Sequence, residues 1–334
     1  MDARDDDYLT ETGERGTRFF FLKFPSEEVA DYWINGDNPT GKRCVAVYFG
    51  SKNAEERRSE WKSNRLGGSE RQGGLDDFFS ACETSHEDTF FVVFLHDDVA
   101  FLRPTSKIQD LSEDWRRSYN ATWGRTVHDG KEEFPKICET EEVKRIPRWK
   151  LPYVLAASNA DQGLNRRTCT RYSKTFHVNA LRRVFNQQIE RPTDARILLE
   201  NLGPIELETL VFLNLHHRGI FCPANRGSTI KGVDILAYTE NRDPVGFPEL
   251  NPVTFKKSPT RFQVKHTVAT TPANDEDYDY LVALEAPSSP KVLDGEWIMR
   301  ATSTQDDCYQ WLKNTLSWTS WNNEEWDEIR TKYR

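Results

Sequence analysis

The stretches KGVDILAYTENRD, residues 231–243, and RFQVKHTV, residues 261–268, both have the apolar and β-branched residues typical of β-strands. Because side chains alternate between the two faces of a strand, Gln263 and Lys265 point to the same face of the second strand. Asp234 lies within the apolar run of the first strand. The sequence therefore predicts two neighbouring strands that bring a carboxylate, an amide and an ammonium group together.

These three side chains suit the hydrolysis of a phosphodiester. That reaction needs a positioned water, neutralisation of charge on the phosphate and stabilisation of the leaving oxygen, and a divalent metal ion can serve all three needs. Magnesium prefers oxygen ligands and needs only one or two protein carboxylates. The Asp234 carboxylate and the Gln263 carbonyl oxygen can hold the ion, while Lys265 can orient the attacking water or offset charge on the phosphate.

A helix is predicted directly before the first of these strands. Within GPIELETLVFLNLHHRG, residues 203–219, leucine and valine recur at helical spacing. Pro204 marks the start of this helix and Gly219 lies past its end. Glu206 and Glu208 lie in its first two turns, so the helix offers a second carboxylate to the site.

The order of these motifs resembles the PD-(D/E)XK nuclease superfamily and, within it, the Mrr-like restriction endonucleases, over about residues 195–300. In that family an acidic helix precedes the strand with the metal-binding Asp, and a strand with a QxK motif follows. The resemblance implies that Glu208 is the helix carboxylate, with Glu206 as the alternative. It also implies that Glu208, Asp234 and Gln263 bind Mg²⁺, with Mn²⁺ as a second choice, and that Lys265 is catalytic.

Two segments depart from the family pattern. Residues 238–259 are longer than the usual hairpin between the two catalytic strands, which we interpret as an insertion that touches DNA. The helix expected after the QxK strand is reduced to TTPANDED, residues 270–277. Further strands are predicted at residues 220–225, 278–286 and 295–302, and the tail, residues 306–334, has the rhythm of one or two amphipathic helices.

The first half of the chain is expected to be a β-rich recognition domain, residues 18–175, behind an acidic leader, residues 1–17. Strands are predicted at residues 18–24, 42–50, 89–104 and 136–158, and a helix at residues 74–83. PKICETEEVKRIPRWKLPYVLA, residues 135–156, has a faint similarity to EVE and other PUA-like domains, which read modified bases in an aromatic pocket. Trp33, Trp123 and Trp149 are the candidates for base recognition, and burial in the core is the alternative for each.

A basic strip lies where the pattern changes from strands to helix. Residues 161–192 carry seven basic residues against two acidic ones, in a chain of net charge −8. An amphipathic helix within residues 176–195 is expected to link the two domains, and a solvated helix face is the alternative interpretation of its charge. The predicted nucleic-acid contacts are Arg166, Arg167, Arg171, Lys174, Arg182, Arg183 and Lys231.

Length and composition limit the class of protein. The 334 residues suffice for two domains, the second being a nuclease domain at residues 196–305, and the six cysteines are scattered singly, which predicts reduced structural thiols. No apolar run approaches a membrane span and the N-terminus does not resemble a signal peptide, so we expect a cytoplasmic protein.

The expected fold class is α/β (α+β), a restriction-endonuclease-like mixed sheet flanked by helices behind a β-rich, PUA-like domain. The expected function is a magnesium-dependent DNA endonuclease of restriction type in antiviral defence, a homodimer directed at base-modified DNA. An RNase or a ligand-activated defence nuclease is one alternative. A non-catalytic nucleic-acid-binding protein that keeps the nuclease fold is the other.

Overall fold

The computed structural model describes residues 16–38, 40–48, 52–67, 74–84, 87–113, 135–158, 164, 167–223, 233–239, 250, 253, 259–268, 278–285 and 291–334. The chain divides into two compact units, residues 1–174 and residues 175–334. Helix α8 (Thr175–Val184) opens the second unit and ends earlier than the predicted segment 176–195. The helix predicted as a linker is thus part of the second unit.

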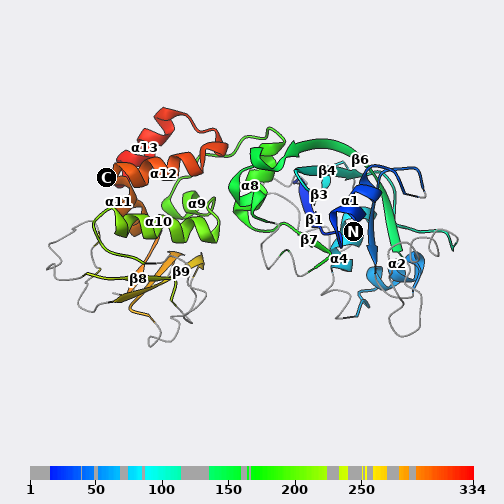
Figure 1. Cartoon of the computed structure of the whole chain (residues 1–334), viewed down its shortest axis with the longest axis horizontal. Coiled ribbons are helices and arrows are strands. Elements are labelled where there is room, and N and C mark those ends of the chain that lie inside the picture. The colour runs from blue at the N-terminus through cyan, green and yellow to red at the C-terminus, as the bar shows by residue number, and fades with distance from the viewer. Residues whose placement is uncertain are drawn as a thin grey trace. The chain divides into compact units, whose positions relative to one another are not determined.

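The first unit is built on a curled, mixed sheet of seven strands in the order β2-β6-β4-β3-β1-β7, with β5 paired to β6 (Figure 1). The pair β1 and β3 is parallel, and the other described pairings are antiparallel. The strands are β1 (Arg18–Leu22), β2 (Cys44–Tyr48), β3 (Thr89–Phe94), β4 (Asp98–Pro104), β5 (Gln109–Asp110), β6 (Pro135–Pro147) and β7 (Cys169–Arg171). The segment predicted as one strand at residues 89–104 thus forms two strands, β3 and β4, with a turn at residues 95–97.

Helices α1 (Glu27–Ile34), α2 (Ala54–Lys62) and α4 (Leu75–Glu83) contribute buried side chains to the core of the first unit. The unit also contains the short helices η3 (Arg148–Lys150) and α6 (Tyr153–Ala156). Phe78 of α4 packs on Phe91 of β3, with ring centroids 5.8 Å apart. Gly74, with φ of +89°, allows α4 to start against β7, since a Cβ there would lie 1.9 Å from the Cys169 carbonyl oxygen.

The second unit has a four-stranded mixed sheet in the order β11-β10-β9-β8. Strands β8 and β9 are antiparallel, whereas β10 is parallel to both β9 and β11. Figure 1 shows helices covering one face of this sheet, where Leu207, Leu210 and Val211 join Ile235 and Phe262 in one core. The elements are α9 (Ala195–Leu199), α10 (Pro204–His216), β8 (Ile235–Ala237), β9 (Thr260–Val268), β10 (Tyr280–Glu285), β11 (Val292–Leu293), α11 (Gly295–Ser303), α12 (Asp306–Thr315), η7 (Ser317–Thr319) and α13 (Asn323–Tyr333).

The strand predicted at residues 295–302 is wrong, because this segment forms helix α11. The Asp294 carboxylate caps the helix by accepting the Trp297 N–H at 3.0 Å. Trp297, Ile298 and Met299 form a consecutive apolar run that fits a buried strand, but all three are buried in the helix. A short apolar run does not distinguish a strand from a helix that is buried on most sides.

The fold prediction is confirmed at the level of a mixed α/β architecture. The six cysteines are buried and free, in agreement with the prediction of structural thiols. Across the part of the chain that the structure describes, helices with the length and apolar character needed to cross a membrane are absent.

Candidate functional site

Asp234 directly precedes strand β8 and is fixed to strand β9 by two hydrogen bonds. Its backbone N–H donates to the Phe262 carbonyl oxygen at 2.8 Å, and its carboxylate Oδ2 accepts from the Val264 N–H at 2.7 Å. The ladder pairs Ile235 with Phe262, so the next position places Asp234 beside Gln263. The strand that carries the QxK motif therefore also holds the aspartate carboxylate.

Strand β9 separates its apolar and polar side chains as the alternation predicts. Phe262 and Val264 are buried in the core beneath the helices. Gln263 is 8% exposed and Lys265 is exposed to solvent. The strand is thus anchored by its apolar side chains, while the amide and the ammonium group lie on its other face.

Glu208 of helix α10 connects electrostatically to the two strands. The pKa of its carboxyl is raised to about 7, mainly by burial and further by the negative charge of Asp234, whereas the positive charge of Lys265 lowers it. These interactions require Glu208, Asp234 and Lys265 to lie near one another. Helix α10, the start of β8 and the middle of β9 therefore bring Glu208, Asp234 and Lys265 within electrostatic range of one another.

Glu206 has a different role from Glu208. Its Oε2 accepts the Gly203 N–H at 2.7 Å, which closes the first turn of α10. Burial raises the pKa of Glu206 to about 7, and the Gly203 hydrogen bond lowers it. Residues two apart on a helix differ by about 200° in direction, so only one of these carboxylates can face the strands. Of the two alternatives, Glu208 is the carboxylate that interacts electrostatically with Asp234 and Lys265.

The donor set at this site fits a hard divalent cation. Two carboxylates and one amide oxygen meet the needs of Mg²⁺, which keeps several of its own waters, and Mn²⁺ accepts the same ligands. The charge of Asp234 raises the pKa of Glu208, and a cation between them would relieve that repulsion. Within the described residues, clusters of three or more His, Cys, Asp or Glu side chains suited to a metal are absent.

Helix α8 contacts strand β9 next to the site. The Phe176 ring meets the His266 ring edge to face, with centroids 5.1 Å apart, and His266 directly follows Lys265. Phe176 is buried, and at the other end of α8 Arg183 donates to Ser320 Oγ at 2.7 Å. The first helix of the second unit thus supports the strand that carries Lys265.

The basic strip predicted to contact nucleic acid is divided between the two units. Arg167, Arg171 and Lys174 belong to the first unit, and Arg182 and Arg183 to the second. An ion pair joins Arg167 Nη1 to Asp77 Oδ2 at 3.8 Å. Arg166 and Lys231 lie outside the described residues, as do nearly all of the predicted insertion at residues 238–259 and all of residues 270–277.

The three tryptophans predicted to recognise a base differ in their surroundings. Trp33 is fully buried in the core of the first unit, with the Tyr32 ring against it at 5.6 Å, so it presents no face on which a base could stack. The prediction for Trp33 is therefore wrong, and its alternative, a core residue, holds. Trp149 is 79% exposed. Trp123 lies outside the described residues.

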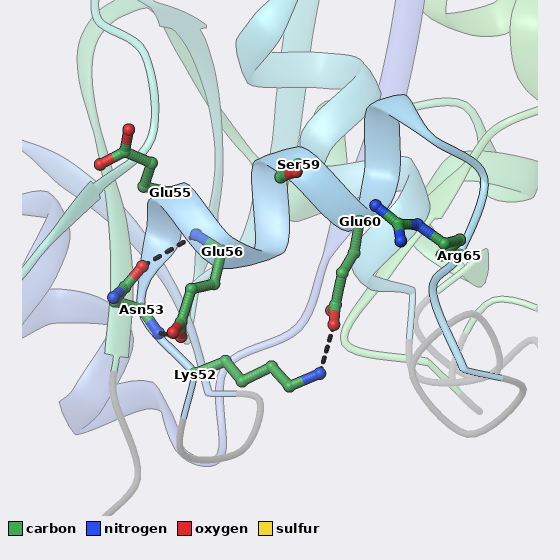
Figure 2. A pocket seen from close by; sticks show the side chains of 7 residues that line it. All are labelled: Lys52, Asn53, Glu55, Glu56, Ser59, Glu60 and Arg65. Carbon is green, nitrogen blue, oxygen red and sulfur yellow. Dashed lines mark hydrogen bonds and ion pairs between the residues drawn. The ribbon is translucent and has the colours of Figure 1, made fainter.

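A hollow over helix α2 in the first unit is lined by Lys52, Asn53, Glu55, Glu56, Ser59, Glu60 and Arg65 (Figure 2). Four of these residues bond to one another in two pairs. Lys52 pairs with Glu60, and Asn53 and Glu56 form the capping box of α2. These bonds stabilise helix α2 locally, and this role explains the charged residues that form them.

The chain matches no protein-family model, no curated protein and no solved structure. Its function must therefore be inferred from the site itself.

Proposed function

We propose that this protein is a magnesium-dependent DNA endonuclease of restriction type, with its active site in the second unit. The observation that carries the proposal is the 2.7 Å hydrogen bond from the Val264 N–H to the Asp234 carboxylate, which fixes this carboxylate to the strand of the QxK motif. The interactions of Glu208 with Asp234 and Lys265 support it. An acidic helix, an aspartate and a QxK strand in this order are the motifs of the PD-(D/E)XK nucleases. The mixed sheet with helices on one face is compatible with such a domain.

Each side chain has a distinct role in the proposed reaction. Glu208, Asp234 and the Gln263 amide oxygen would hold magnesium, which supplies Lewis-acid stabilisation and a water of lowered pKa when it is bound. One oxygen of Asp234 is used by the Val264 N–H, which fixes the orientation of the carboxylate and leaves the other oxygen for the ion. The exposed Lys265 ammonium can meet a DNA phosphate and stabilise the charge that grows on it.

The first unit is proposed to direct the nuclease to its DNA, with modified bases as the distinguishing mark. Support comes from the faint PUA-like resemblance of residues 135–156 and from the exposed Trp149 in that segment. A recognition unit joined to a cutting unit is the arrangement that a restriction enzyme requires. Action on foreign DNA follows from this arrangement.

The test is a cleavage assay on modified and unmodified plasmid DNA with Mg²⁺. We expect the wild type to cut, and Asp234→Ala and Lys265→Ala to lose at least about a hundredfold in rate, as removal of one transition-state stabiliser does elsewhere. Lys313→Ala is the matched control, because Lys313 is a lysine of the same unit that bonds to Asn323 on the surface. Equal cutting by all four proteins refutes the nuclease, and cleavage of RNA but not DNA favours the RNase alternative.

A further inference from the structure

One short segment of the first unit carries several exposed apolar side chains. Val143 is 42% exposed, Trp149 79% and Tyr153 56%, and these are three of the five large apolar side chains found exposed among the described residues. All three fall within residues 143–153, from the end of β6 to the start of α6. We call this segment the aromatic-basic surface. Clustering of this kind marks a binding site more often than scattered exposed residues do.

The backbone under the aromatic-basic surface is held in place. Leu151, Val154 and Leu155 are buried and anchor the segment from below. The Arg148 guanidinium donates to the Ala156 carbonyl oxygen from Nε at 3.3 Å and from Nη2 at 3.0 Å. The two exposed rings therefore stand on a fixed support, so little conformational freedom is lost when a ligand stacks on them.

The segment itself is basic, and acidic residues border it, because Glu142 precedes it and Asp98 pairs with Pro147 in the sheet. Residues 143–153 contain four basic residues and no acidic one, whereas the protein has a net charge of −8. Arg145 forms an ion pair with Glu142, and the Arg148 guanidinium donates to the Ala156 backbone carbonyl oxygen. Lys150 Nζ lies 5.0 Å from the centroid of the Trp149 ring. Lys150 thus holds a positive charge over one face of an exposed ring, in a cation–π contact.

We propose that the aromatic-basic surface binds single-stranded DNA, with bases stacked on Trp149 and Tyr153 and a phosphate close to Lys150. Aromatic rings and cations on one surface are the two features that hold unpaired polynucleotides. In a duplex the base faces are covered by their neighbours, so exposed rings cannot reach them. The choice of DNA over RNA rests on the proposed nuclease function. The proposed stacking of bases on the two rings does not depend on that function.

The test is the binding of a fluorescently labelled oligo-dT to the full chain, followed by anisotropy with EDTA present so that nothing is cut. Loss of one stacked base weakens binding by about 5- to 100-fold, and we expect this for Trp149→Ala and Tyr153→Ala. Trp149→Phe keeps a ring and should retain most of the affinity. Lys150→Gln should weaken binding and lower the salt dependence by about one phosphate contact.

The matched control is Phe221→Ala, which removes an equally exposed ring, 62% accessible, from the second unit. Because Trp149 is mostly in solvent, its replacement should leave thermal unfolding unchanged. The proposal is overturned if Trp149→Ala binds oligo-dT as tightly as the wild type, or if Phe221→Ala loses as much affinity as Trp149→Ala. It is also overturned if the wild type binds the matching duplex or oligo-U more tightly than oligo-dT. The binding of oligo-dT is measured in EDTA and needs no cutting, so failure of binding and failure of the nuclease are separate results.

Discussion

At the scale of single residues, Glu208 carries the carboxyl group whose pKa bears most directly on the proposed chemistry. Its carboxyl is partly buried and lies close to a second carboxylate, which raises its pKa to about 7. Such an arrangement costs folding free energy in the absence of a cation, because a charge must be held in a poorly solvated place. Sites that bind or catalyse often carry this kind of cost.

We therefore predict that Glu208→Gln stabilises the metal-free protein. The unfolded carboxyl titrates near 4.5 and the folded one near 7, so the wild type loses stability as the pH rises through this interval. After a discount for solvent at this partly exposed group, the variant should gain about 1 kcal/mol at about pH 8 and almost nothing below about pH 4.5. Chemical denaturation at both pH values in EDTA measures this, with the exposed Glu324→Gln as the matched control. A destabilised variant at about pH 8 contradicts the prediction.

The same carboxyl predicts the pH dependence of cleavage. Glu208 must lose its proton to hold magnesium, so the rate should rise as the pH increases through about 7. More magnesium should move this rise to lower pH, because the ion competes with the proton. Initial cleavage rates between about pH 5.5 and pH 8.5 at two magnesium concentrations provide the measurement. A rate that is independent of pH, or a rise that magnesium does not move, excludes Glu208 as a ligand.

Part of the site follows from the sequence alone. The alternation of apolar and polar residues placed Gln263 and Lys265 on one face of β9, since a strand allows few other arrangements. The resemblance ranked Glu208 before Glu206, and the hydrogen bond that joins Glu206 to the Gly203 N–H gives a physical reason for this order. The bond from Val264 to Asp234 depends on the register of β8 against β9, which long-range pairing decides.

At the scale of elements, the sequence predicted the positions of strands better than it predicted the helices that pack beside them. Strands β1, β2, β3, β4 and β10 all lie within predicted segments, because their β-branched and aromatic runs are bounded by turns. Helix α11 was missed, since its apolar run is buried on most sides. The contact of α8 with β9 joins segments about ninety residues apart, and no local pattern indicates it.

That contact leads to a prediction for helix α8. Phe176→Leu leaves a smaller apolar group against His266 and should cost about 1 kcal/mol of stability. We expect cleavage to fall about tenfold at a temperature where the variant is folded, with the KM for DNA unchanged, because the end of β9 that carries Lys265 loses its support. Tyr333→Leu, at another buried ring of the same unit, is the control that should lose stability without losing rate. Equal rate losses in both variants would show that Phe176 contributes only to stability.

At the scale of the whole molecule, each unit has its own sheet and its own core, and the proposed activities are divided between them. Glu208, Asp234 and Lys265 belong to the second unit, and the aromatic-basic surface belongs to the first. A ligand stabilises only the unit that binds it. Binding and cutting should therefore be separable in the intact chain by their effects on unfolding.

We predict two unfolding transitions in differential scanning calorimetry, each moved by one ligand. Magnesium at about ten times its dissociation constant adds about 1.4 kcal/mol, which should raise the transition of the second unit by about 4 °C. Oligo-dT should raise only the other transition. Glu208→Gln, measured in EDTA, identifies the second unit by the transition that it moves, and Asp234→Ala should abolish the effect of magnesium. If magnesium raises the transition that Glu208→Gln leaves unchanged, the metal binds outside the proposed site. If magnesium still raises the transition of the second unit in Asp234→Ala, Asp234 is not a ligand.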